Sequence, residues 1–203
     1  MAKKGAKGQQ TAARILDVAE PLFARKGYDA TSLREIAAAA GIREPGLYNY
    51  FKGKQQLYSA VLDRALSPMA EAMKLHLDSE ESLRALADLP TVMTDLLLEH
   101  PTVAALFQQA LQGDPDSIGN QLIMDWLGRL FAQSVDILGE VGIDNPDRAD
   151  LVIQTIAMFN LTTGYFLSQR VFEALVGGDI TAPENVDRQK KLLAKLQRAM
   201  LID

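Results

Sequence analysis

The stretch GIREPGLYNYFKGK, from Gly41 to Lys54, places a proline and a glycine near the start of an apolar, helical pattern. Both residue types normally disfavour a helix interior. The first-turn amides of a helix have no intrahelical acceptor, so Pro45 loses no hydrogen bond there and its fixed φ suits that turn. Gly46 has no side chain to hold the backbone away from a phosphate or a base edge. The pair therefore predicts a helix start built for close approach, and an ordinary first-turn proline beside an indifferent glycine is the alternative.

The residues before this stretch predict a helix-turn-helix over residues 32–51. Ser32 and Glu35 have the spacing of a capping box, and the helix that they begin stops at Gly41. Ala37 is small enough to let a second helix pack closely, and Gly41 can make the turn. The positions expected to face the core are Ile36, Ala40, Ile42, Leu47 and Tyr50. Such a unit places the N-terminal part of its second helix in the DNA major groove.

The composition is that of a globular protein. Of 203 residues, 48% are hydrophobic and 23% are charged, which is too apolar for a disordered chain. The absence of cysteine excludes disulfides, thiolate nucleophiles and cysteine-ligated zinc, and it fits a reducing cytoplasm. We expect neither a secretory signal at the N-terminus nor a membrane span, because polar residues interrupt even the most apolar segment, 151–167.

The net charge of −5 is divided unevenly along the chain. Residues 1–64 carry 11 Lys and Arg against 6 Asp and Glu, whereas residues 65–203 carry 10 against 20. A basic N-terminal part joined to a larger acidic part suggests that the first part faces a polyanion. Chance clustering of surface charge is the alternative.

Helical periodicity dominates the whole sequence and predicts an all-α protein of about nine helices. We expect a flexible basic tail over residues 1–10, a helix-turn-helix domain over 11–53 and a helical effector-binding and dimerisation domain over 54–203. In the last of these, Ser67-Pro68 predicts a bend or an end, and a single long helix is expected near 146–176. A final helix is expected near 182–200, after a capping box at Thr181 and Glu184.

One extended pattern runs through the first quarter to a third of the chain. It consists of Ala19, Leu22 and Phe23, then KGY (26–28), TSLREIA (31–37), AGI (40–42), LYNYF (47–51), GK (53–54) and Leu57. With this spacing intact, the sequence resembles the TetR family of transcriptional regulators. This resemblance implies a three-helix DNA-binding domain, a larger helical domain that binds a largely apolar small effector, and a homodimer on a palindromic operator. By position, the resemblance implies phosphate contacts for Thr31, Ser32, Tyr48 and Lys54, with Tyr50 as a further candidate. It implies base reading, or support of it, for Arg43, Glu44, Gly46 and Asn49.

The acidic part supplies a dimer surface and candidate effector contacts. The helix near 146–176 is apolar on more than one side, so one face can pack in its own domain while another contacts the same helix of a second subunit, with the helix near 182–200. A central helix in a monomer is the alternative. Candidate effector contacts, for each of which ordinary packing is the alternative, are Met73, His76, Met93, Phe107, Trp126, Phe131, Phe159 and Asn160.

We therefore expect a ligand-responsive, DNA-binding transcriptional regulator in the cytoplasm, namely a homodimeric repressor that a small molecule releases from its operator. A transcriptional activator with the same DNA-binding domain and a helical protein-interaction scaffold are the alternatives. No enzymatic activity, cofactor or metal site is expected, because the chain has no cysteine, two isolated histidines and no glycine-rich phosphate loop.

Overall fold

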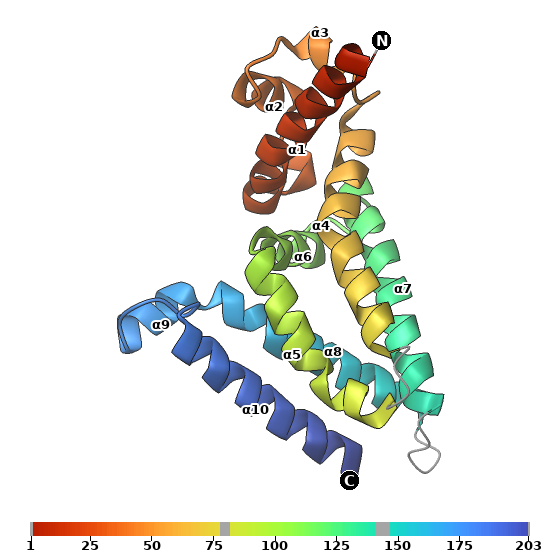
Figure 1. Ribbon diagram of the computed structural model, residues 1–203, viewed down its shortest axis with the longest axis vertical. Coiled ribbons are helices and arrows are strands. Elements are labelled where there is room, and N and C mark those ends of the chain that lie inside the picture. The colour runs from red at the N-terminus through yellow and green to blue at the C-terminus, as the bar shows by residue number, and fades with distance from the viewer. Residues whose placement is uncertain (1, 78–81, 141–146, 203) are drawn as a thin grey trace. The chain divides into compact units, whose positions relative to one another are not determined.

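The computed structural model describes residues 2–77, 82–140 and 147–202, and every regular element in these ranges is a helix. The all-α prediction is confirmed, with ten helices in the described ranges rather than about nine (Figure 1). Their bounds are α1 (Ala2–Ala30), α2 (Leu33–Ala39), α3 (Glu44–Leu47), α4 (Lys54–Leu77), α5 (Ser82–Glu99), α6 (Thr102–Gln112), α7 (Ile118–Glu140), α8 (Arg148–Leu167), α9 (Gln169–Leu175) and α10 (Pro183–Ile202).

The chain divides into two compact units. Unit 1 comprises residues 1–67 and 105–125, and unit 2 comprises 68–104 and 126–203. This division by packing assigns the end of α6 and the start of α7 to the same unit as the helix-turn-helix. The functional domains expected over 11–53 and 54–203 stay a prediction. Where a flexible tail was expected over residues 1–10, the structure has helix from Ala2.

The core of unit 1 joins α1, α2, α3 and the first half of α4. Its completely buried side chains include Ile15, Phe23, Ile36, Leu47 and Leu57. The helical path of α1 is interrupted at Gly27, whose φ of 76° is readily adopted only by glycine. The chain can thereby turn toward α2 before residue 30.

The helix-turn-helix is built by local hydrogen bonds. The Ser32 hydroxyl accepts a hydrogen bond of 3.1 Å from the Glu35 amide and caps α2. At the other end, Gly41 has a φ of 67°, and the amides of Gly41 and Ile42 donate to the carbonyls of Ala38 and Ala37. These two bonds form a Schellman motif, so Gly41 makes the predicted turn.

The second helix of the motif, α3, begins as the sequence predicts. Arg43 is its N-cap, and Pro45 lies in the first turn, where its missing amide costs no hydrogen bond. Regular helix ends at Leu47. The chain then continues as turns, in which the Tyr50 and Phe51 amides both donate to the Leu47 carbonyl. Leu47 is fully buried and anchors α3 to the core.

In unit 2, α10 packs along α5 and α8 (Figure 1). Lys190 of α10 forms an ion pair with Asp95 of α5. On the other side, the side-chain amide of Gln189 donates to the Leu161 carbonyl of α8 over 3.2 Å. These polar contacts border apolar packing that includes Leu193 and Leu97, both fully buried.

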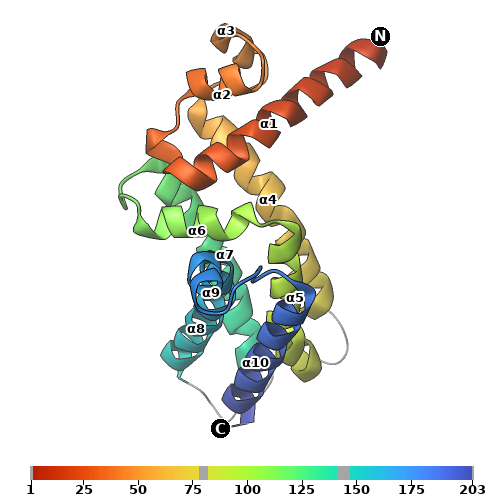
Figure 2. The ribbon, with the colours of Figure 1, turned by 90° about the vertical axis from the view of Figure 1, so that its left-hand side faces the viewer.

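The single long helix expected near 146–176 is wrong within the described residues, because the chain bends by 63° between α8 and α9 (Figure 2). At the bend, the Ser168 hydroxyl donates to the Gly164 carbonyl over 2.7 Å, a contact that favours helix bending. The bend is held from outside, since the Tyr165 hydroxyl donates to the Ile180 carbonyl and the Gln169 amide oxygen accepts from the Ile180 amide. The predicted start at Pro146 lies outside the described residues, and Asp147 caps α8.

Of the bend or end expected at Ser67-Pro68, the end is wrong, since α4 runs through Pro68 to Leu77, and the bend stays a prediction. Proline removes one backbone hydrogen bond, and the surrounding helical residues tolerate its absence.

Among the described residues, no single helix has both the length and the apolar character to cross a membrane. The bent pair α8 and α9 reaches that standard only when its two helices are taken together.

Candidate nucleic-acid interface

The outer surface of the helix-turn-helix presents most of the predicted DNA-binding residues to solvent. Arg43, Tyr48 and Asn49 are exposed, with Tyr48 51% exposed although it is a large aromatic residue. Glu44, Gly46 and Tyr50 are partly exposed. A Cβ added at Gly46 would meet no atom within 4 Å, so this face of α3 is open. The arrangement can approach a groove with its backbone as well as its side chains.

The two residues predicted at the start of α2 have different roles in the structure. Ser32 is exposed and caps the helix, so its position remains accessible to a phosphate. Thr31 is only 1% exposed, and its hydroxyl donates to the Gly27 carbonyl over 2.7 Å. In this conformation the Thr31 side chain ties the start of α2 to the end of α1.

Lys54, the first residue of α4, contacts the end of α1. Its ammonium lies 4.5 Å from the centroid of the Tyr28 ring, and it donates a hydrogen bond of 3.0 Å to the Asp29 carbonyl. Burial lowers the pKa of Lys54, and the Asp29 carboxylate opposes that shift. The Lys54 side chain is therefore held by two contacts inside unit 1.

Tyr28 belongs to a cluster of three aromatic rings. It stacks on Phe23 at a centroid distance of 6.2 Å and meets Tyr58 edge to face at 5.1 Å. Burial raises the pKa of the Tyr58 phenol, and Tyr28 and Asp29 raise it further. Burial followed by Asp29 likewise raises the pKa of Tyr28. Both phenols are therefore neutral near pH 7 and can donate hydrogen bonds.

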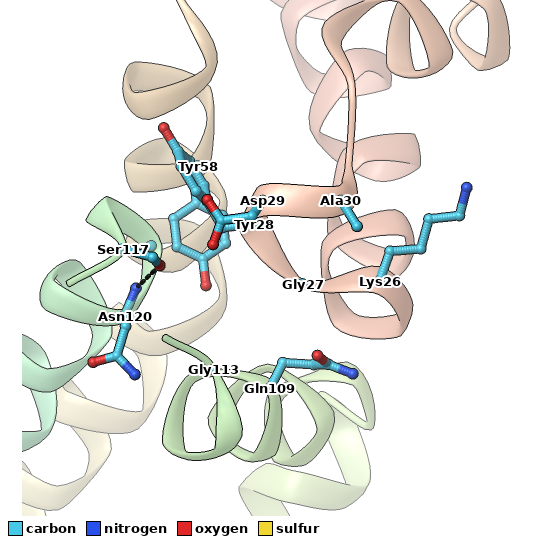
Figure 3. A pocket seen from close by; sticks show the side chains of 11 residues that line it. Lys26, Gly27, Tyr28, Asp29, Ala30, Tyr58, Gln109, Gly113, Ser117 and Asn120 are labelled. Carbon is cyan, nitrogen blue, oxygen red and sulfur yellow. Dashed lines mark hydrogen bonds between the residues drawn. The ribbon is translucent and has the colours of Figure 1, made fainter. Parts of the chain in front are cut away.

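A shallow pocket of about 160 Å³ opens beside this cluster, inside unit 1 (Figure 3). Tyr28 and Tyr58 form one side, and Asn120 lies on another, where its backbone amide donates to the Ser117 hydroxyl over 3.1 Å. Where α7 passes Tyr28 there is no space for a side chain, since a Cβ added at Gly119 would lie 2.2 Å from the Tyr28 Cβ. The sequence interpretation missed this packing, because nothing local at Gly119 indicates a partner more than 90 positions away in the chain.

A second contact that the sequence did not predict joins α6 to α1. The Gln109 side-chain amide donates to the Arg25 carbonyl over 3.4 Å, and its oxygen lies 3.1 Å from where a Cβ at Gly27 would be. Gln109 thus satisfies a backbone carbonyl just before the interruption of α1.

The predicted effector residues are dispersed. Phe107 lies in unit 1, whereas Met93, Trp126, Phe131 and Phe159 lie in unit 2. The structure brings Phe131 and Phe159 together, edge to face at 5.2 Å. Asn160 is exposed, and the side chains of Met73 and His76 lie outside the described residues. None of the six whose side chains are described lines the pocket beside Tyr28, and the ligand contacts predicted for all eight stay predictions.

The described geometry defines a class of protein, an all-α chain with an exposed helix-turn-helix near its N-terminus. Residues 15–61 match the family described as bacterial regulatory proteins, tetR family. The predicted resemblance is confirmed for residues 15–61, which match this family.

Relatives with an assigned function match a longer part of the chain than residues 15–61. The HTH-type transcriptional repressor ComR of Escherichia coli K12 is 35% identical over 113 residues, which cover 53% of this chain and 54% of ComR. The match thus spans about half of that relative. The matched relatives are transcriptional regulators rather than enzymes.

Solved structures share the fold over nearly the whole chain. A TetR-family regulator from Bordetella parapertussis 12822 has a TM-score of 0.71 at 19% identity and covers 92% of this chain and 93% of its own. AibR, solved in complex with isovaleryl coenzyme A and operator DNA, has a TM-score of 0.65 at 17% identity, covering 92% and 97%. At these identities the likeness shows the fold alone.

Proposed function

We propose that this protein is a transcriptional regulator that binds a palindromic DNA operator as a homodimer and is released from it by a small, largely apolar effector. The observation that carries the proposal is the exposed surface of α3 and the turn after it, within a TetR-family domain. Residues proposed to read bases or support that reading are Arg43, Glu44, Gly46 and Asn49. Residues proposed to meet phosphate are Ser32, Tyr48 and Tyr50, and Thr31 holds Ser32 in place from within the core.

The surface of unit 2 supports homodimerisation. Eight of the twelve large apolar side chains that are exposed among the described residues belong to α8, α9, Val176 and α10, which is why we assign the contact to this region. On α8, Leu151, Met158 and Thr162 are buried, whereas Ile153, Ile156 and Leu161 are exposed on the opposite face. Apolar surface of this extent normally marks an interaction site. A second copy supplies the same apolar surface, so a two-fold contact covers both at once.

Unit 2 is the proposed site of effector binding, with Phe131 and Phe159 among its walls. AibR, which has the same fold, was solved with an acyl coenzyme A and operator DNA together, so the fold is compatible with both partners. The effector acts by shifting the population of dimers toward one whose two reading helices no longer fit half-sites about 34–36 Å apart. An activator would use the same DNA-binding domain with the opposite response to the effector.

The function is tested by selecting duplexes from a random library with the purified protein, which is expected to enrich a palindrome. Arg43→Ala and Asn49→Ala are each expected to lower the preference for the selected sequence by about 1–3 kcal/mol, because each removes a side chain placed to read base edges. Competition with scrambled duplex measures that preference, and Arg34→Ala, an exposed residue of α2, is the matched control. If no sequence is enriched, the scaffold alternative is favoured instead.

A substitution at Gly46 is expected to change operator affinity without destabilising the fold. Gly46→Ala is expected to leave the free energy of unfolding unchanged or raise it by up to about 1 kcal/mol, since a Cβ there meets no atom within 4 Å and alanine favours helix. Operator affinity is expected to fall about tenfold or more, because the methyl group prevents close approach of the backbone. Thermal unfolding and operator titration measure the two quantities. An unchanged operator affinity would show that the DNA does not approach this position closely.

A further inference from the structure

Lys54 has a contact pattern that its expected phosphate-binding role does not explain. Its ammonium lies over the Tyr28 ring and donates to the Asp29 carbonyl, so the side chain is directed to the α1–α2 connection. A cation over an aromatic face is attracted by the ring quadrupole, and the attraction strengthens as water is removed. A lysine that serves only as a phosphate ligand needs neither of these contacts.

The contacts of Lys54 join two parts of the chain that flank the helix-turn-helix. Asp29 precedes α2, and Lys54 follows α3, so the hydrogen bond between them spans 25 positions and closes the segment that holds the whole helix-turn-helix. Ser32, which precedes α2, and Tyr48, which follows α3, both lie inside the closed segment. At the start of this segment, an ion pair of 2.6 Å between Lys26 and Glu35 also ties α2 to the end of α1.

We propose that Lys54 is a positioning residue, whose contacts with Tyr28 and Asp29 close residues 29–54 into one rigid element and hold the phosphate-binding and base-reading side chains in register. This inference rests on the proposed DNA-binding function. In it, Tyr28 contributes to operator affinity although it carries no charge and lies outside α2 and α3. Preorganisation of this kind raises affinity because less ordering remains to be done on binding.

Salt dependence distinguishes a positioning role from a phosphate contact. Each phosphate contact steepens the fall of log affinity with log salt by about 0.9, so a substitution that removes one contact from each subunit of a homodimer makes this slope shallower by about 1.8. Lys54→Met keeps a long apolar stem without the charge, and we expect operator affinity to fall about three- to tenfold with an unchanged slope. Tyr28→Leu is expected to cause a similar fall, and the fall in the double variant is expected to be smaller than the product of the two single falls, because both substitutions remove the contact between Lys54 and Tyr28.

Two variants serve as controls. Lys54→Arg is expected to restore most of the affinity, since a guanidinium stacks on aromatic rings and donates to carbonyls. Lys52→Met removes an exposed cation two positions away. If Lys52 contacts no phosphate, this substitution changes neither the operator affinity nor the slope of affinity against salt. A slope shallower by about 1.8 in Lys54→Met, with wild-type affinity in Tyr28→Leu, would overturn the proposal in favour of a direct phosphate contact from each subunit.

Amide hydrogen exchange on the DNA-free protein tests the closure without assuming DNA binding. We expect both Lys54→Met and Tyr28→Leu to speed exchange about three- to tenfold in α2, for example at Ile36 and Ala40, whose amides donate to Ser32 and Ile36. Exchange that stays at the wild-type rate in Lys54→Met would overturn the closure itself. Faster exchange in a protein that selects no duplex would uphold the closure and reject the proposed function alone.

Discussion

Placing aspartate on the exposed face of α8, as Ile153→Asp with Leu161→Asp, is expected to lower affinity for the full operator by about 10²–10⁴-fold. Ile153 is 64% exposed and Leu161 is 45% exposed in the single chain, so the substitutions leave the core of unit 2 intact. They place charges inside the proposed dimer contact, where desolvation and like-charge repulsion oppose association. Affinity for DNA falls because the second half-site is no longer bound intramolecularly.

Sedimentation gives the mass of the variant, and titration of a full operator and of a single half-site gives the two affinities. We expect a monomer that binds the half-site as wild type does. Leu111→Asp is the matched control, because Leu111 is exposed to a similar degree in α6, far in sequence from the dimer surface. A variant that remains a dimer would show that the contact lies on another surface.

The features of the helix-turn-helix that were predictable from sequence are those fixed by short-range geometry. Ser32 with Glu35, the Schellman turn at Gly41 and the first-turn position of Pro45 all involve partners within five residues. Local spacing specifies such partners, because caps and turns demand particular residue types at particular offsets. The exposed positions of Arg43 and Asn49 follow once Leu47 is recognised as the buried anchor of α3.

The features that sequence did not predict depend on distant partners. The bend at Ser168 is held by Ile180, which lies beyond α9, so the periodicity of residues 146–176 did not reveal it. The Thr31 hydroxyl also lies 3.4 Å from the Leu22 carbonyl, nine positions away, so its burial depends on how the chain turns at Gly27. The contacts of Lys54 with Tyr28 and Asp29 likewise form only after α1 and α4 have packed. A family resemblance indicates that such residues lie near DNA. It does not reveal which of their side chains already contact other parts of the protein.

Gly119 is the clearest case of a long-range requirement, and Gly119→Ala is expected to destabilise unit 1 by about 1–3 kcal/mol. Its added Cβ would lie 2.2 Å from the Tyr28 Cβ and 2.6 Å from Cγ. Neither atom is the far end of a flexible side chain, so no rotamer change relieves the overlap and the backbone of α1 or α7 has to move. Because the unstrained effect of glycine to alanine in a helix is favourable by up to about 1 kcal/mol, the clash has to overcome that gain as well.

Gly128→Ala is the matched control for this prediction. Gly128 lies in the same helix, is exposed, and would meet no atom within 4 Å with an added Cβ, so its substitution is expected to stabilise the protein by about 0.5–1 kcal/mol. Amide exchange in the last turns of α1 reports the effect of Gly119→Ala in unit 1, and exchange in α7 around residue 128 reports that of Gly128→Ala in unit 2, which avoids assuming that both units unfold together. Tyr28 also supports Lys54, so Gly119→Ala is expected to weaken operator binding while Gly128→Ala leaves it unchanged. Equal stabilisation by the two substitutions would mean that α7 does not pack directly on Tyr28 in solution.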